Sequence, residues 1–320
     1  MWLRHGLVGA LTYVPGFNYI LDKRKRRMKA RNRGSAKKSA PLALENWFRF
    51  INGLYKAGMP VSPVTNVAEL GPGDSFGLGF AALLGGTQTY YGLDTIKYAE
   101  SSLNLALFDE MVEVIANDFR GCDLKWLDEE YHSQLDVFRK VVSNAERLQQ
   151  IRQAIPVAID GNGHSGAIRY IAPWEPSCND FAGSIDLVVS NAVLEHVIDL
   201  EGTYSRLAVL LKPGGWMSHL IDFSSHGLAI EWNGHWKLGN FAWKLVSGRR
   251  PFLINRQPYS VHEKLIRQNS FEIASCVRRE TTSSLLRNQL SPEWRSINDE
   301  DLICHTAIVY ARKAQSQLSP

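Results

Sequence analysis

The pattern that most limits how this chain can fold is a buried strand, a glycine-rich turn and a helix in residues 64–84. A short run of β-branched and apolar residues comes first, which is typical of a strand buried on both faces. Gly71, Gly73 and Gly77 follow, and the apolar run after them favours a helix. Glycine lets the chain reverse sharply and lets a ligand approach bare backbone, while a helix start offers unpaired N–H groups. The pattern therefore predicts an α/β fold with a polar ligand at this turn.

Acidic residues stand at the ends of the first two predicted strands. Glu69 comes two positions before Gly71, and Asp94 ends the second run, residues 89–94. An acid at the tip of the second strand, about 20 residues after the glycines, binds ribose hydroxyls in doubly wound sheets. The glycines here are spaced G-x-G-x-x-x-G, whereas dinucleotide-binding proteins have G-x-G-x-x-G. The spacing disfavours a nicotinamide dinucleotide.

Two further segments continue the pattern. Residues 184–197 form a buried run with a polar tip, followed by Leu-Glu-His-Val, and residues 210–215 read Leu-Leu-Lys-Pro-Gly-Gly before a predicted strand at 216–222. Together with the glycine turn and Asp94, these segments resemble the ordered motifs of class I S-adenosylmethionine-dependent methyltransferases. The resemblance implies a doubly wound, mostly parallel seven-stranded sheet of Rossmann-like type, with S-adenosylmethionine as cofactor.

The resemblance also implies a cofactor site at the carboxyl ends of the strands. Its expected residues are Glu69, Gly71, Gly73, Ser75, Asp94, Trp174, Ser190 and Asn191. Glu69 and the glycine loop would lie near the methionine part of the cofactor, Asp94 on the ribose, and Asn191 along the path of the methyl group. Two alternatives stay open at this point: Glu69 caps the turn, and Trp174 packs in the core instead of stacking on adenine.

The acceptor side is expected to lie after the fifth strand, in the loops of residues 223–262, which are rich in Trp, His, Asn and Arg. His226 is the candidate general base because imidazole titrates near neutral pH, and Asp222 would orient it. A purely structural histidine is the alternative. The expected substrate contacts are His196, Trp232, His235, Asn255 and Arg256, with Glu195 beside them.

No metal site is expected from the sequence. The four cysteines are widely scattered, and no Cys/His cluster has the spacing of a metal site. Reduced thiols in a cytoplasmic protein are the simplest interpretation.

The N-terminus differs from the rest of the chain in its charge. Residues 1–40 hold eleven Lys or Arg against one acid, while the whole chain has a net charge of +4. A solvated arm, an anionic membrane surface at the inner face of the membrane and nucleic acid are the three interpretations. Nucleic acid is disfavoured because no aromatic residues alternate with the basic ones. The longest uncharged run, residues 6–21, is shorter than the roughly 20 residues that span a bilayer, and a signal peptide is not expected because the basic cluster follows the apolar run.

The expected organisation is a basic arm (1–40), one methyltransferase domain (41–312) and a flexible tail (313–320). Residues 40–57 have helical spacing, and we expect them to form a packing helix or a cover for the cofactor. Residues 96–160 are helical in pattern and longer than a crossover between parallel strands needs, so an inserted helical segment is expected.

The expected activity is methyl transfer from S-adenosylmethionine to a small-molecule acceptor. The loops after the fifth strand are similar to those of bacterial methyltransferases of sugar and surface-polysaccharide pathways, which makes a sugar hydroxyl the candidate acceptor. The alternatives are a non-catalytic relative that binds a cofactor or partner and, less favoured, a nicotinamide-dependent oxidoreductase.

Overall fold

The structure is a computed structural model that describes residues 2–14, 40–62, 64–161, 164–175, 180–250, 252–283 and 285–315. The basic cluster of residues 23–33 and the end of the tail lie outside these ranges, so the partners of the arm and the limits of the domain stay predictions. Within the described ranges, each helix is too short or too polar to cross a bilayer. The three described cysteines, Cys122, Cys276 and Cys304, are free.

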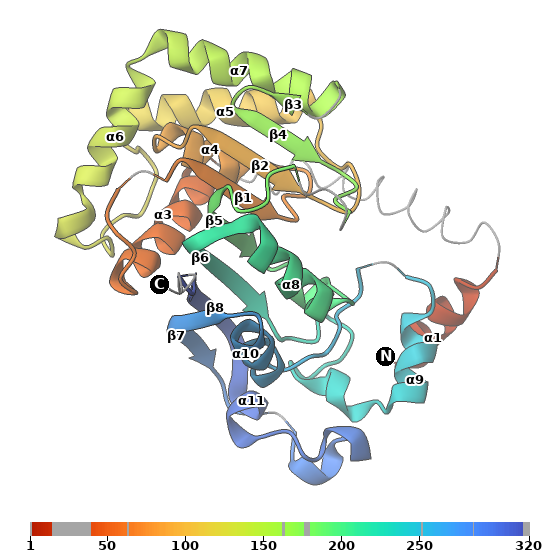
Figure 1. Ribbon diagram of the computed structural model, residues 1–320. Helices are drawn as coiled ribbons and strands as arrows, with labels where there is room; N and C mark the ends of the chain where they lie inside the picture. The colour runs from red at the N-terminus through yellow and green to blue at the C-terminus, as the bar shows by residue number, and fades with distance from the viewer. Residues whose placement is uncertain are drawn as a thin grey trace.

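One sheet organises the described chain, with strand order β3-β4-β2-β1-β5-β6-β8-β7 (Figure 1). The strands are β1 (Asn66–Leu70), β2 (Thr89–Leu93), β3 (His164–Ser165), β4 (Ile168–Ile171), β5 (Ile185–Asn191), β6 (Leu211–Asp222), β7 (Phe271–Glu280) and β8 (Cys304–Lys313). Strands β4, β2, β1, β5 and β6 run parallel, and β8 lies antiparallel between β6 and β7. The predicted seven-stranded, mostly parallel sheet is confirmed. The two-residue β3 adds an antiparallel edge to it.

Helices cover both faces of this sheet. The described helices are α1 (Trp2–Leu11), α3 (Ala40–Lys56), α4 (Gly77–Leu84), α5 (Ser101–Ala116), α6 (Ser133–Val142), α7 (Ala145–Asp160), α8 (Leu200–Leu210), α9 (Asn240–Ser247), α10 (Tyr259–Gln268) and α11 (Asp299–Ile303). Helices α1 and α9 pack against each other to one side of the sheet (Figure 1). Short 3-10 turns include η2 (Leu194–His196) and η3 (Gly234–Lys237). The segment predicted to be a helical insertion holds α5, α6 and α7.

The burial of alternate strand residues explains why the strands are apolar throughout. Val67 and Val189 belong to the core cluster shared with α3, α4, α5 and α7. Their neighbours Ala68 and Val188 belong to the cluster on the other face, under α8 and α10. Successive side chains of a strand point to opposite faces, so a sheet covered on both faces needs apolar residues at every position.

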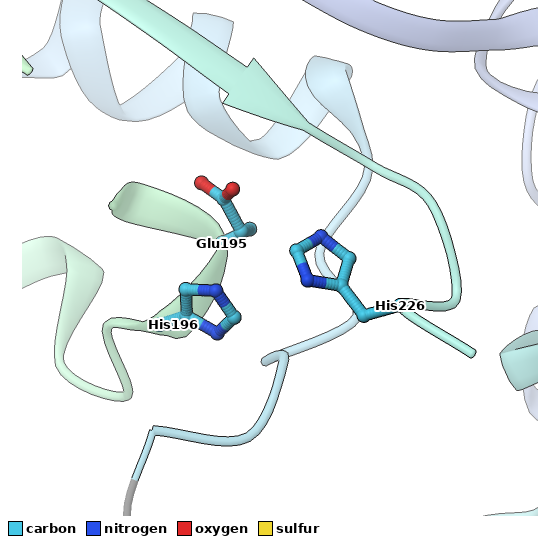
Figure 2. Close-up of side chains that lie close together, drawn as sticks. All are labelled: Glu195, His196 and His226. Atoms are coloured by element: carbon cyan, nitrogen blue, oxygen red, sulfur yellow. The ribbon is translucent and has the colours of Figure 1, made fainter. Parts of the chain in front are cut away.

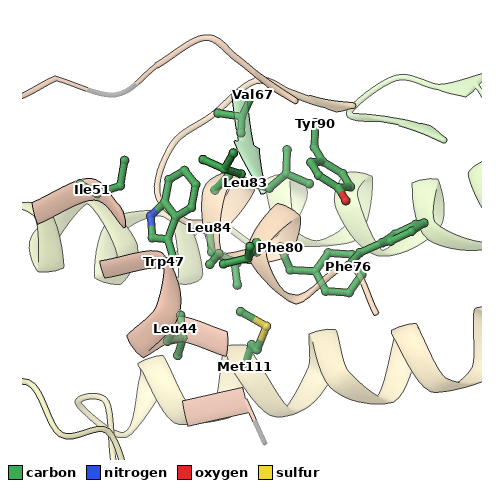
Figure 3. Packing of buried hydrophobic residues seen from close by; sticks show 14 of the residues in the cluster. Leu44, Trp47, Ile51, Val67, Phe76, Phe80, Leu83, Leu84, Tyr90 and Met111 are labelled. Carbon is green, nitrogen blue, oxygen red and sulfur yellow. The ribbon is translucent and has the colours of Figure 1, made fainter. Parts of the chain in front are cut away.

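Helix α3 is a packing helix in the structure. Its buried residues recur at helical spacing, and Leu44, Trp47 and Ile51 lie against α4 in the larger core cluster (Figure 3). Helix α4 is buried along its whole length. Burial of one face of α3 against α4 and α5 stabilises the layer that supports the glycine turn.

Gly79 should be sensitive to the addition of a single methyl group. A Cβ at Gly79 would lie 2.4 Å from Cζ of Tyr90, whose side chain is fully buried. We expect Gly79→Ala to lower the free energy of unfolding by about 1–3 kcal/mol, because the ring has no free space to move into. Urea denaturation would measure the loss. Gly6→Ala on α1 is the matched control, since a Cβ there meets no atom within 4 Å. Equal stability of Gly79→Ala and the parent protein would contradict the packing described.

Candidate active site

Four parallel strands end at the same edge of the sheet. The register pairs β1 with β2 and β5, and β5 with β6, all in parallel. The ends of these strands carry Glu69, Asp94, Asn191 and Asp222. Ligands of doubly wound sheets bind outside the carboxyl ends of the strands. This edge is therefore where the predicted site residues meet.

The glycine turn is tied to Asp94. The backbone N–H of Gly73 donates to Oδ2 of Asp94 at 3.0 Å, and the N–H of Thr95 donates to Oδ1 at 2.7 Å. Gly71 and Gly73 have φ of +62° and +67°, the left-handed region that favours glycine. A Cβ at Gly71 would lie 2.9 Å from both γ carbons of Val193, whereas a Cβ at Gly73 would meet no atom within 4 Å. The loop thus leaves open space beside a carboxylate, which suits a ligand that carries hydroxyl groups.

Glu69 lies beneath the glycine turn and contacts Tyr90. The Tyr90 hydroxyl donates to Oε2 of Glu69 at 2.8 Å, and both side chains are buried. Burial, followed by the charge of Glu69, raises the pKa of Tyr90 well above its ordinary value. Tyr90 was not expected at the site, because the pair joins two strands and has no local sequence pattern.

Trp174 and Ser75 lie on either side of this region. The backbone N–H of Trp174 donates to the carbonyl of Asp94 at 2.7 Å. The guanidinium of Arg206 lies 5.2 Å from the centre of the Trp174 ring, so one face of the indole already has a partner. Ser75 is half-buried in the loop itself.

The two residues at the end of β5 point to different surroundings. Ser190 is fully buried, and its hydroxyl shares a hydrogen bond with Nδ1 of His219 at 2.8 Å. Its side chain therefore joins β5 to β6 inside the sheet and does not line the open space. Asn191, one residue later, is exposed at the tip.

Three side chains converge next to this tip, two from the turn after β5 and one from the loop after β6. Figure 2 shows Glu195, His196 and His226 close together, with the carboxylate of Glu195 directed away from the two rings. One ligand atom of each lies within 4.8 Å of the others. The rings of His196 and His226 are 5.0 Å apart between centroids and nearly perpendicular, at 87°. This arrangement can accept a proton or bind a cation. We call these three residues the acceptor cluster.

Asp222 orients one member of the acceptor cluster, as expected from the sequence. Nε2 of His226 lies 3.4 Å from Oδ2 of Asp222. Burial raises the pKa of Asp222, but hydrogen bonds from His226 and Ser224 outweigh that effect and lower the pKa to about 2. The hydrogen bond to Asp222 raises the pKa of His226. Nδ1 of His305 approaches the other carboxylate oxygen of Asp222 at 4.0 Å. No local sequence pattern points to this histidine, which lies near Asp222 because β6 pairs with β8.

Glu195 is buried, with 3% of its surface exposed. No side chain of the described residues donates a hydrogen bond to its carboxylate oxygens, and only the backbone N–H groups of Glu195 and Asp222 approach them. Burial raises the pKa of Glu195 to about 8. Burial and the nearby charge of His226 lower the pKa of His196. The pKa shifts of both residues have the same cause, which is that a charged form is poorly solvated here.

Asn255 holds the turn that carries Glu195 and His196. Its side-chain amide donates to the carbonyls of Leu194 and Val197, each at 2.7 Å, and its backbone N–H donates to the carbonyl of Glu195 at 2.6 Å. The amide nitrogen is therefore occupied inside the protein. The structure favours a positioning role for Asn255 over the substrate contact expected from the sequence.

The remaining expected substrate contacts divide into two groups. The half-buried ring of Trp232 lies 5.2 Å from the ring of His305, which places it near Asp222. His235 and Arg256 are buried. The guanidinium of Arg256 donates to the carbonyl of Leu238 at 2.7 Å and lies over the ring of Trp243. Arg256 thus supports the loops after β6, and the structure does not bring it to the acceptor cluster.

The sequence matches the family model described as a methyltransferase domain over residues 87–253, more than half of the chain. No curated protein matches it. The solved structures that it resembles have low identity and low TM-scores. One is the CurJ carbon methyltransferase, at 13% identity and TM-score 0.37, covering 81% of this chain and 50% of that one. This chain therefore spans half the length of that structure.

Two other solved structures illustrate the range of similarity. An S-adenosylmethionine-dependent methyltransferase from Mesorhizobium loti has 14% identity and TM-score 0.39, covering 82% of this chain and 96% of that one. Phosphoethanolamine N-methyltransferase 2 from Haemonchus contortus, in complex with S-adenosyl-L-methionine, has 16% identity and TM-score 0.40. That match covers 89% of this chain and 59% of the other.

Proposed function

The chain belongs to the methyltransferase-domain family, and from this premise we propose that it methylates a hydroxyl group of a small-molecule acceptor. The enzyme uses S-adenosylmethionine as its cofactor. Membership of this family argues against one alternative considered from the sequence, a nicotinamide-dependent oxidoreductase. The other alternative, a non-catalytic relative, is tested by the assay below. The identity of the acceptor and the roles of individual residues are the proposed part.

The residues at the glycine turn fit the cofactor. The open space above Gly73 lies beside the carboxylate of Asp94, which would accept hydrogen bonds from the ribose hydroxyls. Gly71 and Glu69 would lie along the methionine part. When bound, S-adenosylmethionine supplies a methyl group on a positively charged sulfur, and the electron pair of the broken carbon–sulfur bond stays on that sulfur. The chain must align the acceptor with this group, exclude water and remove the proton of the acceptor.

The observation that carries the proposal is the position of the acceptor cluster. The glycine turn touches the segment that bears the cluster, because Gly71 packs against Val193, two residues before Glu195. A buried carboxylate with a half-buried and an exposed histidine, beside a methyl-transfer site, suits an acceptor that must lose a proton. A hydroxyl group is such an acceptor.

We assign proton removal to His226. Asp222 holds Nε2–H of the ring, which leaves the lone pair of Nδ1 for the acceptor. The hydroxyl proton passes to Nδ1 while the acceptor oxygen forms its bond to the methyl carbon. His196 and Glu195 border the same space, and Asn255 fixes the turn on which they stand.

A sugar hydroxyl is the acceptor that we propose within this class. Trp232 offers a half-buried aromatic ring near Asp222, and aromatic side chains with a few polar groups are the usual lining of small-molecule sites. A sugar ring has both an apolar face and a hydroxyl edge, and it can therefore use both features. Contact of the basic arm with an anionic membrane from the cytoplasmic side would suit a lipid-linked sugar.

His226→Gln tests this assignment. We expect kcat to fall by about 10²–10⁴-fold, because a glutamine cannot take up a proton, with the affinity for S-adenosylmethionine unchanged. The assay is transfer of a labelled methyl group to a panel of sugar nucleotides, other alcohols and amines. His132→Gln is the control, since His132 bonds to the carbonyl of Leu127 in another part of the chain. Methylation of amines alone, or full turnover by His226→Gln, would refute the proposal.

A further inference from the structure

The acceptor cluster contains polar atoms that lack strong hydrogen-bond or charge partners. Glu195 has 97% of its surface covered, and no side chain of the described residues donates a hydrogen bond to either carboxylate oxygen. Among these residues, only the backbone N–H groups of Glu195 itself and of Asp222 lie close enough to stabilise its charged form weakly. Nδ1 of the half-buried His196 is likewise without a partner in that part of the chain. Buried polar atoms are nearly always paired, and a buried carboxylate needs a positive charge or several donors. These unpaired atoms lie in one place and are all electron-pair donors.

The ring orientations direct two lone pairs into the same space. Asp222 accepts from Nε2 of His226, which leaves Nδ1 as the free nitrogen of that ring. His196 bonds to the backbone of Phe252, and Nδ1 is its unpartnered nitrogen in the described structure. Figure 2 shows the two rings beside each other and the carboxylate of Glu195 pointing away from them, with one oxygen still within 4.8 Å of a nitrogen of each ring.

We propose that Glu195, His196 and His226 bind a divalent transition-metal ion. Two imidazoles and one carboxylate on one side of an ion leave coordination positions open on the other side. A positive ion would pair the buried carboxylate and both free nitrogens at once. The inference rests on the proposed function for what fills an open position, namely the hydroxyl oxygen of the acceptor.

Further contacts support these three ligands. A histidine that binds a metal commonly donates its other ring N–H to a carboxylate, and Asp222 accepts that bond from His226. Asn255 holds the backbone around Glu195 and His196 through three hydrogen bonds. Nitrogen and oxygen donors about 2.1 Å from a metal lie roughly 3–3.5 Å from one another. The observed separations are up to 4.8 Å, so binding requires the Glu195 side chain to rotate toward the two rings.

The donor set selects the kind of ion. Imidazole nitrogen suits zinc, copper, iron and nickel, and carboxylate oxygen also suits manganese, whereas magnesium and calcium prefer oxygen ligands throughout. No metal site was expected from the sequence, because no Cys/His cluster has the spacing of metal ligands along the chain. That spacing cannot reveal the site proposed here. Glu195 and His196 are adjacent, and His226 comes from a different strand end.

A bound ion changes the task of His226. Without it, the lone pair of Nδ1 takes the proton of the acceptor. With it, that lone pair is a ligand, and the ion lowers the pKa of a hydroxyl bound to it so that solvent base removes the proton. His226 therefore acts as a base in the metal-free protein and as a ligand in the metal-bound protein. Metal binding can be measured without any acceptor.

The test uses the full chain after dialysis against a chelator. Mn²⁺ is titrated into the protein, and the free ion is followed by electron paramagnetic resonance; Co²⁺ is then added, and its visible absorption reports the ligand geometry. We expect one ion per chain. Glu195→Gln and His196→Gln should each weaken binding by at least 100-fold, and Asp222→Asn by about 10–100-fold. His132→Gln should bind as the parent protein does.

The outcomes separate this inference from the proposed function. Weak binding that these substitutions leave unchanged would overturn the metal site, and hydroxyl methylation by the same metal-free protein would leave the proposed function standing. Binding of one ion that is lost in Glu195→Gln supports the site, even if only amines are methylated and the proposed function fails. Melting temperatures of the variants, measured without metal, would show that the loss of binding is not a loss of folding.

Discussion

Asp94→Ala is expected to weaken the binding of S-adenosylmethionine by about 100-fold or more. The substitution removes a carboxylate that would accept bonds from the ribose, and hydrogen bonds to a charged group contribute about 1.5–3 kcal/mol each. It also removes the acceptor for the N–H groups of Gly73 and Thr95, which hold the glycine turn in place. Both effects act on the cofactor and neither acts on the acceptor cluster.

Calorimetric titration with S-adenosylmethionine measures this change. Asp94→Asn keeps one acceptor oxygen for Gly73 and loses the charge, so its affinity should fall between those of the parent and Asp94→Ala. Asp109→Ala is the control, because Asp109 forms an exposed ion pair with Arg152. Asp94→Ala protein that is folded and binds the cofactor as tightly as the parent would remove Asp94 from the site.

Glu195→Gln is expected to stabilise the metal-free protein at pH 8, although it weakens metal binding. The pKa of Glu195 is raised from 4.5 to about 8 in the folded state. The folded protein therefore holds this proton more tightly than the unfolded chain does, and the free energy of unfolding decreases as the pH rises from about 4.5 to about 8. Glutamine carries no proton to lose. After the cost of a buried amide, we expect a gain of about 2–4 kcal/mol at pH 8 and no gain at pH 4.5.

Urea denaturation at the two pH values, in the presence of a chelator, measures this difference. Glu201→Gln on the exposed side of α8 is the control and should show no pH-dependent gain. Added transition metal should reduce the difference in the free energy of unfolding between Glu195→Gln and the parent protein at pH 8, because the ion stabilises only the protein that retains the carboxylate. A Glu195→Gln protein with the same stability relative to the parent at both pH values would show that this carboxylate is well solvated or paired.

The strands could be predicted because each one has its own local pattern. The apolar runs before Glu69 and Asp94, and the run that ends at Asn191, became β1, β2 and β5 in adjacent positions. The start of β6 keeps the expected turn. The strand begins at Leu211, but residues 212–215 pair with neither neighbouring strand, and regular pairing starts at Trp216, where the strand was predicted to begin. Gly214 has a φ of +76°, so Pro-Gly-Gly forms a bulge at the start of the strand.

Some contacts in the site could not be predicted from the sequence, because they join residues of different strands. The bond between Tyr90 and Glu69 and the approach of His305 to Asp222 depend on which strands are neighbours. Composition was misleading in the loops after β6. Their aromatic and polar residues suggested a substrate site, yet Trp236 belongs to a separate small core and Arg256 bonds to nearby loop atoms. Residues that can line a pocket can equally fill a core.

The most direct test of the account is to identify the atom that receives the methyl group. The full chain would be incubated with S-adenosylmethionine carrying a ¹³C-labelled methyl group and a panel of sugar nucleotides, other alcohols and amines, and the products would be examined by NMR. We predict a labelled methyl ether on a sugar, formed by the parent and lost in Asp94→Ala and His226→Gln. Label on nitrogen or carbon alone, or no labelled product from protein that binds the cofactor, would contradict the proposed function.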